Sequence, residues 1–270
     1  MELVDVSPET ETTFLHCLHD ERPDDPRVMD MRRRWFHAQL EHGLRGKVLL
    51  LDTGEVGGLC QYMPIERTHM AGRDLLAILC IWVHGYEHLI GNVQGNGYGR
   101  YILESIERDA RESGQLGVAA WGMDFPYWNP VSFYEHMGYV RADKSGMTVL
   151  VWRAFSEAAV APEFLRQVRR PVGDPEKVSL VVFVNGWCMG SCEQSVLARE
   201  ALRGLEDSVY YREYDGSDPG VQSSWGISDG VYLQGEPYRP NEPPWTSEVL
   251  RRDVFELIEG RGAEGRNSAE

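Results

Sequence analysis

A glycine-rich segment, Gln94-Gly95-Asn96-Gly97-Tyr98-Gly99, has the composition of a phosphate-binding turn. An apolar run precedes it, and a helical pattern follows it from Arg100. A side chain at Gly97 or Gly99 would fill the space that phosphate oxygens need, so glycine at these positions leaves room for a ligand. The N–H groups of such a turn and the positive end of the helix dipole attract a diphosphate. We therefore expect an anion site here.

The spacing of these glycines departs from that of a dinucleotide-binding fingerprint. That fingerprint, G-x-G-x-x-G, follows the first strand of a βαβ unit. Here the turn lies about a third of the way along the chain, after strands that read as an antiparallel pair. A glycine-rich loop in front of a solvated helix end is the alternative interpretation of the segment taken alone.

Two thiols, Cys188 and Cys192, lie after an apolar run and at the start of a helical pattern. A helix N-terminus lowers the pKa of a thiol, so Cys188 is the more reactive candidate. On one helix face the two thiols would form a disulfide or bind a soft ion such as zinc, copper or mercury. A complete zinc site needs four ligands, and no second cysteine pair accompanies these two, so no obligate metal is expected. Inert structural cysteines are the third interpretation.

The composition restricts the partners of this chain of 270 residues. Its net charge of −15 repels phosphate backbones, so nucleic acid is not an expected partner. The sequence contains no run of about 18 apolar residues, so no membrane span is expected. Neither a basic, apolar leader nor an even set of cysteines is present, so a cytoplasmic protein is expected.

The hydrophobic patterns predict an α/β first domain around the turn. Residues Leu75–Val83 are apolar at every position, which is typical of a central strand. Residues 52–55 read as the turn of an antiparallel pair. The other expected strands are Glu2–Val6, Lys47–Leu51, Val56–Met63, Gly117–Gly122 and Met147–Trp152, and the expected helices are Ser7–His19, Arg27–His42, Arg100–Glu112 and Val131–Met137.

A second, smaller domain is expected after a linker. Residues 157–177 mix alanine, proline and charged residues, which predicts a boundary between a first domain at 1–156 and a second at 178–262. Residues 263–270 are expected to be a disordered tail. The second domain is predicted to contain strands Val178–Val184, Val209–Tyr214 and Val231–Gln234, with helices Ser191–Leu205, Asp218–Trp225 and Ser247–Ile258.

The order of these elements, with Gln94, Gly97 and Gly99 in the turn, resembles the GNAT N-acetyltransferase superfamily. The segment Phe133–Tyr139 is similar to the superfamily's F/L-Y-x-x-x-G-F/Y ending. This resemblance covers roughly residues 2–155 and implies a central mixed, mostly antiparallel sheet. A narrower resemblance, to acetyltransferases bearing a C-terminal YoaP-like domain, rests on the segments Cys80–Tyr86, Gly91–Gly95, Ala119–Gly122 and Val184–Cys188.

The YoaP-like resemblance implies that the second domain has a thioredoxin-like fold. Two features depart from that family's redox pattern. The cysteines are spaced C-x-x-x-C rather than C-x-x-C, and Ser228-Asp229-Gly230 stands where a cis-proline would precede the third strand. These departures weaken a redox interpretation of Cys188 and Cys192.

The GNAT resemblance implies an acyl-CoA-dependent N-acetyltransferase, with acetyl-CoA as cosubstrate and a small amine as acceptor. Coenzyme A would enter the gap where the strand before the turn parts from its neighbour, pairing its pantetheine amides with the strand backbone. The residues expected to bind the cofactor are Ile81, Trp82, Val83, Gln94, Gly95, Asn96, Gly97, Tyr98, Gly99, Arg100 and Asn129. Asn129 has the alternative role of an Asn-Pro turn.

Acetyl transfer requires a neutral amine, a stabilised oxyanion and a proton for the leaving thiolate. Tyr134 matches the position of the acid in related enzymes, with packing or contact to coenzyme A as its alternative. Asp124, His84 and Glu87 are the candidate general bases. Each also has a structural alternative: a turn or cap residue for Asp124, a packed loop residue for His84, and a solvated surface residue for Glu87.

The loop from His84 to Asn92 is long enough to shape an acceptor pocket. Aromatic residues near it would line that pocket or belong to the core: Trp82, Trp121, Phe125, Tyr127 and Trp128. A different function remains open, in which Cys188 and Cys192 serve a redox or soft-metal protein and the first domain is a ligand-binding platform. A sensing or assembly protein without turnover is a third hypothesis, and pairing into a homodimer through apolar edges is a further expectation.

Overall fold

The computed structural model describes residues 1–18, 25–126, 128–239 and 245–267, with the side chains of 262–267 excepted. Contacts divide the chain into two units, Met1–Leu165 and Arg166–Glu270. Within the described ranges, no helix combines the length and the hydrophobicity that crossing a bilayer requires. Each unit is described by itself.

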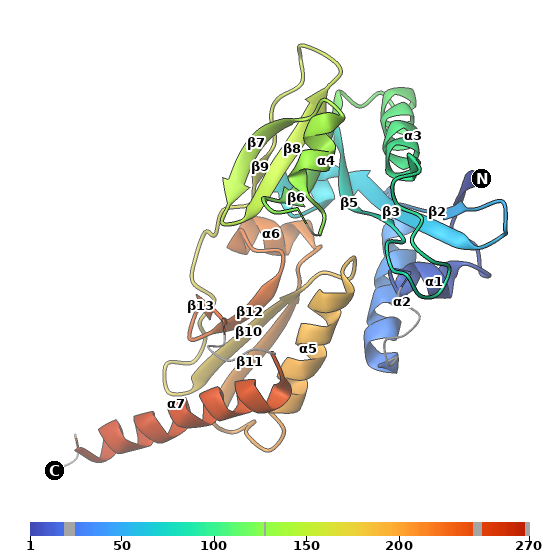
Figure 1. Ribbon diagram of the computed structural model, residues 1–270. Helices are drawn as coiled ribbons and strands as arrows, with labels where there is room; N and C mark the ends of the chain where they lie inside the picture. The colour runs from blue at the N-terminus through green and yellow to red at the C-terminus, as the bar shows by residue number, and fades with distance from the viewer. Residues whose placement is uncertain (19–24, 127, 240–244, 268–270) are drawn as a thin grey trace. The chain divides into compact units, whose positions relative to one another are not determined.

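The first unit is built on a seven-stranded mixed sheet with the strand order β1-β2-β3-β5-β6-β8-β7 (Figure 1). All neighbours in this sheet are antiparallel except β5 and β6, which are parallel. The strands are β1 (Glu2–Asp5), β2 (Arg45–Leu50), β3 (Val56–Pro64), β4 (Met70–Ala71), β5 (Leu75–Val83), β6 (Gly117–Met123), β7 (Val140–Ser145), β8 (Thr148–Ala154) and β9 (Glu163–Phe164). The helices are α1 (Glu11–Leu15), α2 (Pro26–Leu40), the 3-10 turn η1 (Ile65–Arg67), α3 (Tyr98–Glu112) and α4 (Val131–His136).

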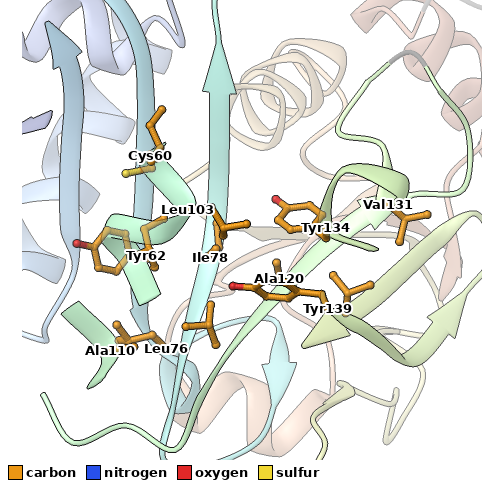
Figure 2. Close-up of a cluster of buried hydrophobic side chains, with 14 of the residues drawn as sticks. Cys60, Tyr62, Leu76, Ile78, Leu103, Ala110, Ala120, Val131, Tyr134 and Tyr139 are labelled. Atoms are coloured by element: carbon orange, nitrogen blue, oxygen red, sulfur yellow. The ribbon is translucent and has the colours of Figure 1, made fainter. Parts of the chain in front are cut away.

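Helix α3 is held on the sheet by a strongly amphipathic face. Ile102, Leu103, Ile106 and Ala110 recur at helical spacing, and all are fully buried against β3, β5 and β6. Figure 2 shows Leu103 and Ala110 in this cluster. Burying one such aliphatic side chain contributes about 1.5–3 kcal/mol. This packing fixes the position of the helix N-terminus relative to the sheet.

The parallel strands β5 and β6 pair along only part of their length. Their register runs from Leu75–Gly117 to Ile78–Ala120 and stops there. Beyond that point β5 continues along β3, and β6 continues along β8. A register shift opposite Gln61 and Tyr62 leaves Leu79 as an extra residue on β5, and such a bulge increases local twist. The carboxyl ends of the two strands therefore part.

The second unit contains a four-stranded sheet with the order β11-β10-β12-β13. The central strand β10 is parallel to β11 and antiparallel to β12. The unit has the α/β architecture expected from the sequence, and its thioredoxin-like assignment stays a prediction. Its elements are β10 (Val178–Val184), α5 (Met189–Ala201), β11 (Val209–Asp215), α6 (Pro219–Trp225), β12 (Gly230–Leu233), β13 (Glu236–Pro237) and α7 (Ser247–Asn267).

The structure differs from the expected elements at several boundaries. The helix expected at Ser7–His19 is only α1, because residues 7–10 form a turn in which the Ser7 carbonyl accepts hydrogen bonds from two N–H groups. His19 lies outside the described residues. Strand β7 was not expected. The first unit runs to Leu165 rather than to residue 156, since β9 pairs with β4. Helix α7 extends through Asn267, and 268–270 lie outside the described residues.

A polar cluster lies where β2 and β3 meet the end of α3. Asp109 accepts hydrogen bonds from the Tyr62 hydroxyl and from Lys47, whose Nζ lies 2.9 Å away. Burial alone would raise the pKa of Asp109, but these two hydrogen bonds outweigh it and the pKa lies below its usual value. The carboxylate therefore contributes stability that depends on its ionisation.

Replacing Asp109 with Asn should lower the free energy of unfolding by about 1–2 kcal/mol near pH 7, because the ion pair with Lys47 is lost. A depressed folded-state pKa gives stability that is complete above the unfolded value of about 3.9 and is lost as the pH falls through the folded value. The difference between wild type and variant should therefore shrink in strongly acidic buffer. Urea denaturation of both proteins at pH 7 and in the strongly acidic buffer measures the two differences in the free energy of unfolding. A difference that is the same in both buffers would contradict the ionised role of Asp109.

Candidate functional site

The glycine-rich turn leaves open space in front of α3. Gly97 is the N-cap of α3 with φ of 80°, and Gly95 has the same φ. This left-handed conformation favours glycine. A Cβ placed at either residue would meet nothing within 4 Å. The space at these two positions is therefore open.

The backbone donors of the turn are free to bind a ligand. Within the described chain, the N–H groups of residues 95–100 have no hydrogen-bond acceptor, whereas Gln94 N–H donates to Asn92 Oδ1 at 3.0 Å. The donors of residues 98–100 belong to the first helical turn, which has no internal partners. The Asn96 side chain braces the turn instead, donating to the Val93 carbonyl at 3.0 Å. The result is a row of backbone donors at the positive end of a helix.

Gln94 ties this turn to the end of β5. Its Nε2 donates to the Val83 carbonyl at 2.9 Å. The amide packs on Gly85, where a Cβ would lie only 2.4 Å from Nε2. Gly85 therefore lets Gln94 reach across, and the turn and the strand keep a fixed separation.

A cavity of about 390 Å³ lies beside the turn. Every residue expected to bind the cofactor lines it except Asn96. From this part of the chain the sequence analysis expected Tyr134 and Asn129 at the site but missed Pro130, Phe133, His136 and Met137, although the segment Phe133–Tyr139 was a signal for them. The residues that line the cavity are Ile81, Trp82, Val83, Gln94, Gly95, Gly97, Tyr98, Gly99, Arg100, Asn129, Pro130, Phe133, His136 and Met137.

The gap between β5 and β6 exposes backbone groups of β5. The Leu79 carbonyl accepts a hydrogen bond from Trp121 Nε1 at 2.8 Å, and the Val83 carbonyl accepts the one from Gln94. Backbone groups alternate sides along a strand, so the N–H and carbonyl of Ile81 face the same gap. An extended ligand with amide groups would find partners there.

Tyr134 lies in the core beneath this cavity and is 1 % exposed (Figure 2). Its hydroxyl donates to Asn129 Oδ1 at 3.4 Å, and Asn129 Nδ2 donates to the Trp121 carbonyl at 2.8 Å. Burial raises the pKa of Tyr134 well above its usual value, and Cys80 adds to this effect. The phenol of Tyr134 therefore keeps its proton. Its hydrogen bond to Asn129 connects it to the cavity, because Asn129 lines the cavity wall.

The three candidate bases have different surroundings. Asp124 binds Lys144 at 2.7 Å and Arg141 at 3.3 Å, and these hydrogen bonds hold its pKa below the usual value. A carboxylate held in this way is a weak base, and Asp124 does not line the cavity. Glu87 is exposed on the loop after β5. His84 is buried, with its Nδ1 2.9 Å from the Gly91 carbonyl.

The aromatic residues expected near the acceptor pocket form two groups. Trp82 lies against Tyr86 with ring centroids 6.1 Å apart. Trp121 lies against the exposed Trp128 at 5.4 Å, and it also packs on a core cluster. Tyr127 lies outside the described residues.

In the second unit, Cys188 is the N-cap of α5 and Cys192 lies in its first turn. Both are reduced thiols. Cys188 is half-buried, whereas Cys192 is fully buried with Sγ 3.8 Å from the Asn185 carbonyl. Among the described residues, no group of three or more His, Cys, Asp or Glu side chains has the geometry of a metal site.

Comparison with known proteins finds no matching family model and one curated relative. That relative is an uncharacterized N-acetyltransferase, YoaP, of Bacillus subtilis, which is 24 % identical over 157 residues. The match covers 53 % of this chain and 55 % of the relative, so the chain spans about half the length of the curated relative it matches.

Solved structures similar to this chain include acetyltransferases of the GNAT family. Escherichia coli YhbS in complex with CoA matches 60 % of this chain and 88 % of its own, at 15 % identity and a TM-score of 0.42. Spermidine N-acetyltransferase of Vibrio cholerae, solved with CoA and spermine, matches 57 % of this chain and 94 % of its own, at 14 % identity and a TM-score of 0.42.

Iodoacetamide should alkylate Cys188 about tenfold faster than Cys192, since Cys188 is more accessible and lies at a helix N-terminus. Cys60 is a buried control, because burial raises the pKa of its thiol. Peptide mass spectrometry of a time course measures the three rates. Equal labelling of Cys188 and Cys192 would contradict the arrangement at α5.

Proposed function

We propose that the first unit of this chain is an N-acetyltransferase of the GNAT type and that it transfers an acetyl group from acetyl-CoA to a small amine. The observation that carries this proposal is the row of N–H groups at residues 95–100, which have no acceptors and lie beside a cavity of about 390 Å³. The relationship to an N-acetyltransferase supports it.

The diphosphate of acetyl-CoA would bind the donors of residues 95–100. Its pantetheine arm would then follow the gap between β5 and β6, where the backbone of Ile81 to Val83 offers hydrogen-bond partners. Arg100 and His136 also line this cavity. Their side chains would favour phosphate groups locally in a chain whose net charge is −15.

The acceptor's amine nitrogen would attack the thioester carbonyl directly. A carbon–nitrogen bond forms and the carbon–sulfur bond breaks. An alkylammonium releases two protons in this reaction, of which one ends on the coenzyme A thiol and one passes to a base and then to solvent. The enzyme therefore needs one proton donor near the sulfur and one acceptor near the amine.

Tyr134 is our proposed donor to the thiolate. Its raised pKa keeps the phenol protonated at neutral pH, and Asn129 connects its hydroxyl to the cavity. Burial opposes formation of a phenolate at Tyr134. The phenol proton therefore has to move to the sulfur as the carbon–sulfur bond breaks, and a proton from the attacking nitrogen has to replace it on the phenol. Asp124 is a poor candidate for the base because it is held by Lys144 and Arg141.

The second unit supports a second candidate function, in which its thiols act on their own. The half-buried Cys188 at the N-terminus of α5, four residues before the buried Cys192, favours a thiol-based redox or soft-metal role. This role and acetyl transfer are compatible, since they use different units.

A Gly97→Glu variant should bind acetyl-CoA on the order of 100-fold more weakly, because a carboxylate would enter the space of the diphosphate and repel it. Gly114→Glu is the matched control. Gly114 has φ of 76° and equally open surroundings, but it follows the other end of α3. Calorimetry of both variants measures the effect. Similar affinities for the two variants, or absent binding by wild type, would refute the proposed site.

A Tyr134→Phe variant should lower kcat about 100-fold with little change in KM for acetyl-CoA, because it removes the proton donor and keeps the ring. Release of free coenzyme A thiol, with protein cysteines subtracted, measures this across a panel of primary amines. Tyr139→Phe is the control, since Tyr139 is buried beside Tyr134 with ring centroids 5.7 Å apart. Equal activity of the two variants would exclude Tyr134 as the acid.

A further inference from the structure

His84 lies where β5 gives way to the loop of residues 84–93. Its N–H donates to the Gly57 carbonyl and its own carbonyl accepts from Val93 N–H, both at 3.0 Å. The side chain is only 2 % exposed. Both backbone groups of His84 are therefore hydrogen-bonded, and its ring is buried within the loop.

The hydrogen bond of the ring determines where its proton lies. Nδ1 is 2.9 Å from the Gly91 carbonyl, and a carbonyl only accepts, so Nδ1 carries the proton. Nε2 is left with a lone pair. This atom is buried, and among the described residues it has no hydrogen-bond partner. A buried acceptor without a donor calls for a ligand or a solvent molecule to supply one.

Two aromatic rings pack on the His84 ring, and a third packs on one of them. The ring of Tyr86 meets His84 edge to face at 5.5 Å, and that of His88 does so at 6.4 Å. Trp82 lies 6.1 Å from Tyr86. The faces of such rings attract cations. An unused acceptor and aromatic rings together form the environment that suits an ammonium group, which supplies both a donor and a positive charge.

The position of this group relative to the cavity fits an acceptor site. Ile81 and Val83 pack against the core beneath α3, so the alternating Trp82 and His84 point to the opposite face of the sheet. The pairing of β5 with β6 ends at Ile78, short of both residues, and Trp82 itself lines the cavity. A thioester in the gap between the two strands would be open to attack from the side of His84.

We propose that His84, Tyr86 and Trp82 form the subsite for the acceptor's ammonium group, with Nε2 accepting a hydrogen bond from the ammonium and the rings facing its charge. The subsite deepens the proposed acetyltransferase function and rests on it. It takes an alkyl primary ammonium, and the exposed Glu87 on the same loop adds to the attraction. The amine reaches the covered Nε2 when the loop tip around Tyr86 and His88 moves aside. Nε2 then takes the first ammonium proton, and the neutral amine attacks.

Nitrogen NMR of the full chain labelled with ¹⁵N-histidine tests this subsite. The Nε2 resonance is assigned by its absence in His84→Asn, whose side-chain amide can still donate to the Gly91 carbonyl. In the unliganded protein Nε2 should show the signal of the lone-pair nitrogen, because Nδ1 donates to the Gly91 carbonyl. Benzylammonium should shift it in a saturable way. Benzyltrimethylammonium has the same ring and charge but no N–H, so it should bind and leave Nε2 nearly unshifted. A protonated Nε2 in the unliganded protein, equal shifts from both probes, or no shift from benzylammonium would overturn the assignment.

The aromatic part of the subsite has its own matched pair of variants. Tyr86→Leu should weaken binding of both probes about threefold, because it removes the ring face, whereas Tyr86→Phe should keep wild-type affinity. Equal affinities in the two variants would remove the cation–aromatic contact from the proposal. Calorimetry with acetyl-CoA distinguishes failure of the subsite from failure of the proposed acetyltransferase function. If acetyl-CoA binds and Nε2 does not respond, only the subsite fails, whereas a responding Nε2 without acetyl-CoA binding refutes the proposed function.

Discussion

The parting of β5 from β6 is the constraint on which the site in the first unit depends. Pairing stops at Ile78 and Ala120, next to the extra residue Leu79 on β5. The freed edge of β5 turns its backbone toward a gap, and Trp121 and Gln94 satisfy only two of the carbonyls there.

The turn before α3 supplies the second half of the proposed site mainly through its backbone. The chain carries a net charge of −15, so its overall field repels anions, and the N–H groups of residues 95–100 would provide a local attraction for a diphosphate. These donors are effective only if the helix end stays in place. The buried face of α3 and the bond from Gln94 to Val83 hold it there, so hydrophobic packing far from the ligand preorganises the polar contacts.

Much of this site could be predicted from sequence because its signals are local. Glycine spacing, the apolar run of β5 and the helical period of α3 all lie within residues 75–112. Strand β7 escaped prediction because its residues are mostly exposed and polar. Arg141 and Lys144 of this strand form ion pairs with Asp124. Without the strand, these ion pairs could not be predicted either. The unpartnered Nε2 of His84 depends on the contact of Nδ1 with Gly91, which only the folded loop creates.

The central claim is that backbone amides of residues 95–100 bind the diphosphate of acetyl-CoA. Amide NMR spectra recorded during titrations with acetyl-CoA and with S-acetylpantetheine, which lacks the diphosphate, test it most directly. The account predicts large shifts of these amides with acetyl-CoA and small shifts with S-acetylpantetheine, while both ligands shift Ile81 and Val83. Amides of residues 95–100 that stay unmoved while acetyl-CoA binds elsewhere would contradict it.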